Sequence, residues 1–253
     1  MRRYRTRSGI SNHDNAAMIR QFRTLGWVFL FAVAMGFLES AVVVYLRAIY
    51  YPDGFAFPLG SMAPLHAVTE LFREAATMVM LVSVAALAAR RFAVAVAWFI
   101  FAFAVWDIFY YLFLYLLMGW PPTLMTWDIL FLIPVMWTGP VLAPVINSLT
   151  MILLAMVIIT ASEKHDTIRL KGVEWSLLIA GALITIIGYT ADYLHFMGSR
   201  FSVPELAGFS NYQEVLQYSS GYIPAHFSWW IFWVGEALFL VATGLFYLRH
   251  SRD

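Results

Sequence analysis

The chain contains no cysteine and very little charge. Its 253 residues include 16 Lys and Arg and 15 Asp and Glu, so 12% of the residues are charged, whereas 62% are hydrophobic. In a soluble domain about 25% of residues are charged, so this composition indicates an integral membrane protein. The lack of thiols excludes disulfides, iron–sulfur clusters and thiolate metal sites. The near balance of charge gives no sign of a nucleic-acid partner.

Six hydrophobic runs are long enough to cross a bilayer as helices, because about 20 apolar residues span its hydrocarbon core. The runs cover residues 24–49, 64–89, 92–120, 138–162, 175–197 and 227–248. The sequence therefore predicts an all-α integral membrane protein, a bundle of six transmembrane helices with the lipid bilayer as its first partner. The helices form one domain, 24–248, between a basic N-terminal tail, 1–23, and a short C-terminal tail, 249–253.

The basic residues predict the orientation of the chain. Thirteen of the 16 Lys and Arg lie on one side, in both tails, the turn at Arg90–Arg91 and the loop 163–174. The other side holds only Arg47, Arg73 and Arg200. Since cytoplasmic segments are enriched in Lys and Arg, we expect both termini in the cytoplasm. The expected location is the inner (plasma) membrane of a bacterium.

Two of the outer loops are long and rich in turn residues. The segment 119–140, GWPPTLMTWDILFLIPVMWTGP, is almost uncharged and contains three tryptophans, which favour the membrane interface. It predicts a short interfacial helix with Asp128 as its cap. In the last outer loop, Ser202 and Glu205 have the spacing of a capping box, which predicts a second short helix.

Acidic residues inside the predicted helices fall in one layer. Counting from the basic flanks at about 1.5 Å per residue puts Glu39, Glu74 and Asp107 about 24 Å into a core about 30 Å thick. Asp192 and Glu236 lie at a similar depth. His195 follows Asp192 by one turn, and His66 and His226 lie near the outer interface. Polar faces of this kind are expected to turn away from lipid and toward one another.

This layer predicts a metal site that opens outward. Six carboxylates with only Arg73, and at most Arg47, to neutralise them cannot all stay ionised in a low dielectric, so they are either protonated or bound to a metal. Carboxylates and imidazoles without thiolates suit iron, manganese or zinc, with copper as a further candidate. The expected ligands are Glu39, His66, Glu70, Glu74, Asp107, Asp192, His195 and Glu236, supported by Arg73, Tyr110 and His226.

Three classes of function fit this layout. The first is a membrane metalloprotein, an oxidoreductase or hydrolase that acts on a hydrophobic or lipid substrate; no catalytic residue is assigned. The second is a cation- or proton-coupled transporter, although the span 138–162 contributes no acid. The third is a subunit of a respiratory membrane complex that contacts partner subunits and binds quinone, or haem through two of its histidines, or has a structural role.

Overall fold

The computed structural model describes residues 8–164, 168–202, 204–205 and 212–251. This part of the chain contains six helices that are long and apolar enough to cross a membrane. They are α1 (Ser8–Tyr50), α2 (Pro64–Ala88), α3 (Phe92–Met118), α4 (Leu142–Lys164), α5 (Gly172–Gly198) and α8 (Trp229–His250). The prediction of a polytopic, largely helical membrane protein is therefore confirmed. α1 begins at Ser8, well before residue 24, so it includes much of the predicted N-terminal tail.

Local sequence signals explain several helix ends. α2 begins at Pro64, a residue that suits the first turn because its missing N–H would have no helical partner there. α3 stops at Gly119, whose φ of 66° is left-handed and therefore favours glycine. At the start of α5, the Glu174 carboxylate accepts the Lys171 N–H at 2.7 Å and so satisfies one free donor of the helix.

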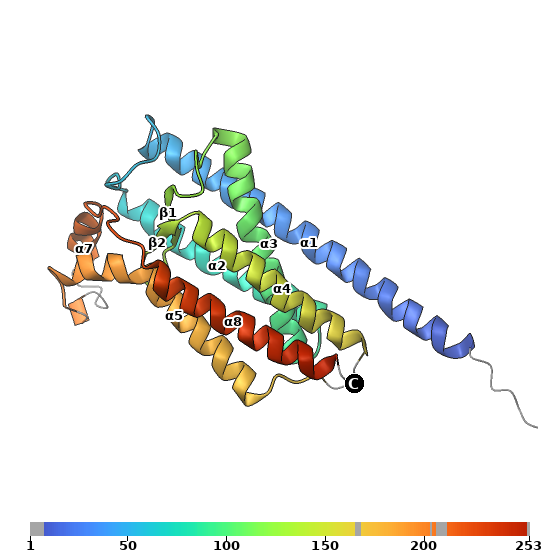
Figure 1. The fold of residues 1–253 in the computed structure, drawn as a ribbon. Helices are drawn as coiled ribbons and strands as arrows, with labels where there is room; N and C mark the ends of the chain where they lie inside the picture. Colours follow the sequence, from blue (N-terminus) through green and yellow to red (C-terminus); the bar gives the residue numbers. More distant parts are fainter. Residues whose placement is uncertain (1–7, 165–167, 203, 206–211, 252–253) are drawn as a thin grey trace, which may run out of the picture.

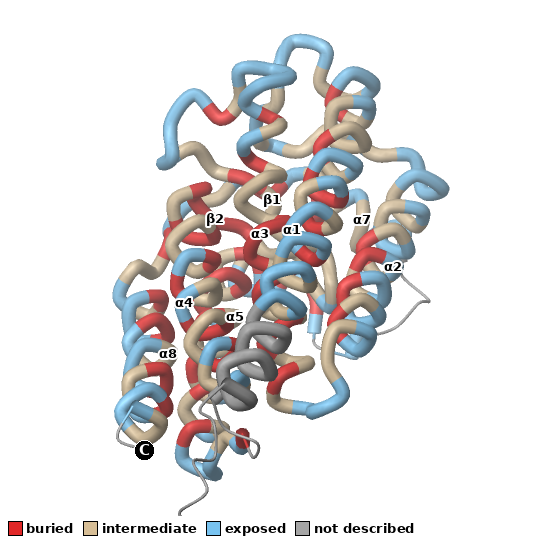
Figure 2. Tube along the Cα trace, turned by 90° about the vertical axis from the view of Figure 1, so that its right-hand side faces the viewer, coloured by how far each residue is buried: buried red, intermediate tan, exposed pale blue. Residues whose placement is uncertain are grey.

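α3 lies at the centre of one half of the bundle, where it packs against α1, α2 and α4. α8 packs against α4 and α5 in the other half (Figure 1). The buried residues follow the faces between these helices (Figure 2). α1 and α3 come close at Gly36, where an added Cβ would lie 3.0 Å from the Trp106 carbonyl oxygen. Many apolar side chains on the opposite faces are exposed, as expected for helices in contact with lipid.

The segment 119–140 forms a β-hairpin, so the prediction of a short interfacial helix there was wrong. β1 (Trp127–Phe131) pairs antiparallel with β2 (Trp137–Pro140), and Asp128 lies opposite Gly139. Prolines interrupt this segment, and each removes a backbone donor and disfavours helix at the preceding residue. Its Trp, Ile and Phe side chains favour strands. Asp128 is consequently a buried strand residue and not a helix cap.

The hairpin lies at one end of the bundle, together with α7 (Tyr212–Ser219) and the loop 51–63 (Figure 1). We call this the hairpin end, and the opposite end, with Arg90, Arg91 and Arg249, the basic end. At the hairpin end, the Glu205 carboxylate accepts the Ser202 N–H at 2.8 Å, which is one of the two bonds of a capping box. The other bond is absent among the described residues, because the Ser202 hydroxyl donates to the same carboxylate at 2.6 Å and the Glu205 N–H bonds the Ser202 carbonyl. Residues 203 and 206–211 of this predicted helix lie outside the described residues.

Candidate functional site

A cavity of about 360 Å³ lies at the hairpin end of the bundle. Its walls come from α1, α2, α3, α5, α7, the loop 51–63 and the hairpin, so most of the fold contributes to it. Aromatic and aliphatic side chains form much of the lining. Charged side chains in the lining are Glu39, Arg47, Glu70, Arg73, Glu74, Asp107 and Asp128. Four predicted ligands and one predicted supporting residue therefore meet at one cavity: Glu39, Glu70, Glu74 and Asp107, with Arg73.

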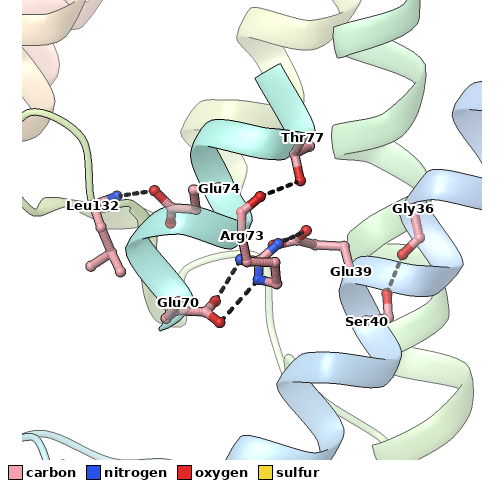
Figure 3. A network of polar contacts seen from close by, with 8 residues as sticks. All are labelled: Gly36, Glu39, Ser40, Glu70, Arg73, Glu74, Thr77 and Leu132. Atoms are coloured by element: carbon pink, nitrogen blue, oxygen red, sulfur yellow. Dashed lines mark hydrogen bonds and ion pairs between the residues drawn. The ribbon is translucent and has the colours of Figure 1, made fainter. Parts of the chain in front are cut away.

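Arg73 joins two of the predicted carboxylate ligands (Figure 3). Its side chain extends from α2 toward α1, where the guanidinium forms an ion pair with Glu39. The same guanidinium donates from Nε to Glu70, one turn earlier on α2, at 2.9 Å. Two negative charges thus share one positive charge, and the three groups link α1 to α2.

Glu74 points to the other side of α2, away from Arg73 and toward the hairpin (Figure 3). This side chain is buried, and its carboxyl accepts the backbone N–H of Leu132 at 2.9 Å. Within the described part of the chain, Glu74 forms no ion pair. The contact fastens α2 to the residue that follows β1. The neighbouring Arg73 guanidinium acts on Glu74 electrostatically, but its ion pairs are with Glu39 and Glu70.

Asp107 occupies a similar position on α3. One of its carboxyl oxygens accepts the Ser148 hydroxyl of α4 at 2.8 Å. Asp107 also forms no ion pair among the described residues. Tyr110 lies three residues further along α3 and lines the same cavity. The cavity therefore exposes two carboxyls, Glu74 and Asp107, that are held only by neutral donors.

Arg47 and Asp128 form a buried ion pair at the base of the hairpin, with 3.2 Å between Nη2 and Oδ1. The Arg47 guanidinium also lies 3.7 Å from the ring centre of Trp120 and 4.4 Å from that of Phe55. Such stacking holds an arginine in place through cation–π attraction. The pair therefore fixes the hairpin to the end of α1.

The Asp128 carboxyl binds protons more tightly than an exposed aspartate because it is buried. Burial disfavours its charged form and raises its pKa to about 6. The nearby Arg47 guanidinium, the Ile129 N–H and the hydroxyls of Tyr111 and Tyr110 stabilise the charged form and limit this rise in pKa. The hairpin thus carries a carboxyl whose pKa lies well above the ordinary value for aspartate.

The remaining predicted ligands lie away from the cavity. Asp192 accepts the Tyr222 hydroxyl at 2.7 Å and two backbone N–H groups, of Ala225 and His226, so it holds the segment that leads into α8. Glu236 is buried and accepts the Asn147 amide at 2.6 Å. His66, His195 and His226 are exposed, and none of them is among the described residues that line the cavity. His66 instead contacts the Tyr50 hydroxyl at 2.5 Å.

The predicted single metal centre gains no support from this geometry. Among the described residues, no group of three or more His, Asp or Glu side chains lies close enough together to hold a metal ion. The carboxylates are distributed between separate partners. Sequence reasoning missed two of these partners, Asn147 and Ser148, although the two adjacent polar residues stand out in the apolar run 142–164.

No protein-family model matches the chain, and no match to a curated protein or to a solved structure was found. The fold defines the class, a polytopic membrane protein with six candidate spans in its described residues. Any function within that class has to be argued from the cavity.

Proposed function

We propose that the protein binds an amphipathic molecule at the hairpin end, with a positively charged polar group of that molecule between Glu74 and Asp107. The observation that carries this proposal is the charge of the lining: five carboxyls against two guanidiniums. Arg73 neutralises Glu39 or Glu70, and Arg47 pairs with Asp128. Three carboxyls stay uncompensated: one of Glu39 and Glu70, which share Arg73, and both Glu74 and Asp107, which form no ion pair among the described residues. Glu74 and Asp107 therefore attract a cation, because buried charge requires a partner.

The size and opening of the cavity support an amphipathic ligand. A volume of about 360 Å³ is within the range of small-molecule sites. Leu71 of α2 and Leu194 of α5 both line the cavity, and each is 39% exposed. The lining of the cavity is therefore exposed on the outer surface of α2 and α5 at these two positions, which supports an opening toward lipid. An apolar tail can extend into the bilayer there while the polar end stays inside.

A divalent metal is the second candidate occupant, as the sequence predicts. The same two carboxyls, Glu74 and Asp107, would supply its oxygen ligands, and hard cations such as manganese prefer oxygen. This proposal has weaker support, because no third His, Asp or Glu among the described residues completes such a group.

Three matched amphiphiles test the first proposal. Dodecylamine, dodecanol and dodecanoate have tails of equal length and differ in the charge of the polar end. Each is added to the protein in lipid nanodiscs, and the apparent melting temperature is measured together with the metal content of the sample. We expect dodecylamine to stabilise the protein, dodecanol to have a weaker effect and dodecanoate to have none.

Conservative variants identify the groups that respond. Glu74→Gln and Asp107→Asn remove the charge but keep an oxygen that accepts the Leu132 N–H or the Ser148 hydroxyl, so the fold is retained. Each is expected to weaken dodecylamine binding by about tenfold, the value of one charged hydrogen bond. Glu163→Gln, an exposed residue of α4, is the control and leaves binding unchanged. Equal effects of all three amphiphiles would contradict the proposal. Bound metal that is lost in both cavity variants would favour the second candidate.

A further inference from the structure

A second set of buried polar groups lies between α4, α5 and α8, outside the cavity. Its centre is Glu236, which is 1% exposed. Oε1 of Glu236 accepts the Asn147 amide at 2.6 Å, but Oε2 has no hydrogen-bond partner in the described part of the chain. Buried polar atoms without partners are rare in folded proteins, and each needs an explanation.

Two further partnerless atoms come from the face of α5 that packs on α8. They are the hydroxyl oxygens of Thr185 and Tyr189, which lie one turn apart and are both buried. The Thr185 hydroxyl lies directly against α8, since a Cβ added to Gly235 would be only 2.3 Å from it. The Tyr189 hydroxyl is close enough to Glu236 and Asp107 to interact electrostatically with both carboxyls. Three orphaned oxygens thus come from the region where α4, α5 and α8 pack together.

Neutral groups alone do not balance an ionised Glu236. Among the described residues it forms no ion pair, and its one hydrogen-bond donor is an uncharged amide. A carboxylate in the interior of a membrane protein requires a compensating positive charge. Carboxylate and hydroxyl oxygens are hard ligands that suit hard cations. One carboxylate balances one positive charge, since Asp107, the neighbouring acid, lines the cavity and belongs to the site proposed there.

We infer that Glu236, Thr185 and Tyr189 form a binding site for a small monovalent cation such as Na⁺. The site is separate from the cavity of the proposed function and has a different ligand. Asn147 is a positioning residue, because its amide holds Oε1 of Glu236 and leaves Oε2 directed to the ion. Cation binding joins α5 to α8 and should stabilise the bundle.

The test measures the apparent melting temperature of the purified protein while choline chloride is replaced by LiCl, NaCl or KCl at constant ionic strength. At a Na⁺ concentration one hundred times the dissociation constant, the expected rise is about 5–10 °C. Glu236→Gln should abolish the rise. Thr185→Val, which keeps the shape of the side chain, should increase the half-saturating concentration by about tenfold.

Glu163→Gln and Glu74→Gln should both keep the rise in melting temperature with Na⁺. Glu236→Gln should keep the stabilisation by dodecylamine. The proposed cation site and the proposed function of the cavity can therefore be refuted independently of each other. The inference is overturned if the melting temperature is the same in choline as in all three alkali chlorides. It is also overturned if the response survives in Glu236→Gln, or if only Mg²⁺ produces it. Should Glu236→Gln not fold, the shifted half-saturation of Thr185→Val decides the question.

Discussion

Replacing Arg73 by methionine should destabilise the protein more than the loss of an ordinary ion pair. Arg73 is largely buried, with a side chain 20% exposed, and it serves both Glu39 and Glu70. Removing it leaves two carboxylates in a region of low dielectric without a cation. Breaking a buried pair in this way costs about 3–5 kcal/mol, and the partial exposure of Arg73 places the expected loss near 3 kcal/mol. For a chain of this size, that corresponds to a melting temperature lower by about 6–12 °C.

The assay is thermal unfolding in detergent, followed by tryptophan fluorescence, with Arg200→Met as the matched control. Arg200 pairs with Glu214 at 2.8 Å, but both side chains are 53% exposed, so its loss should change stability by less than about 1 kcal/mol. Adding Glu39→Gln and Glu70→Gln to Arg73→Met should recover most of the loss, because no uncompensated charge remains. The reasoning is refuted if Arg73→Met and Arg200→Met have equal effects, or if the triple variant is no more stable than Arg73→Met.

Three further predictions concern other parts of the fold. Gly235→Ala should lower the melting temperature, because the new Cβ would meet a hydroxyl of α5 at 2.3 Å and backbone atoms at 3.2 and 3.3 Å, whereas Gly244→Ala, with nothing within 4 Å, should not. The pKa of Asp128, raised by burial to about 6 from an ordinary value near 4, means that the folded state favours the protonated carboxyl. The contribution of Asp128 to the free energy of unfolding is therefore fully present below about pH 4 and falls by about 3 kcal/mol as the pH rises through 6. In a pH titration of the melting temperature, Asp128→Asn should remove this pH-dependent contribution. Because the chain has no cysteine, a single cysteine reports topology: in intact cells an impermeant maleimide should label Ser61→Cys at the hairpin end but not Ser162→Cys at the basic end, and the reverse pattern would refute the predicted orientation.

The helices could be predicted because each depends on its own run of apolar residues. The hairpin could not, since strand pairing joins residues about ten positions apart and depends on the neighbours that cover them. In the segment 119–140 the aromatic content suggested an interfacial helix, whereas the prolines and the partner strand determine the outcome. The burial of Asp128 follows from that pairing and from Arg47 at the end of α1, 81 residues away.

The candidate site shows the same limit more sharply. Depth along a helix is readable from sequence, so the layer that contains Glu39, Glu74 and Asp107 could be predicted, and all three do line one cavity. The direction in which each side chain points around the helix axis is harder to predict from sequence. Asp192 and His195 are three residues apart and therefore only about 60° apart around the helix axis, yet Asp192 is hydrogen-bonded to the segment before α8 and His195 is exposed. Which donor meets each acid depends on how helices distant in sequence pack together.

Native mass spectrometry of the protein extracted from its own membrane is the most direct test of the central claim that the cavity binds an amphipathic cation. The account predicts a bound molecule of defined mass that contains a basic nitrogen, retained in Glu163→Gln and lost or strongly reduced in Glu74→Gln and in Asp107→Asn. A spectrum with only bulk phospholipid, or a bound molecule that survives in both cavity variants, would contradict the claim.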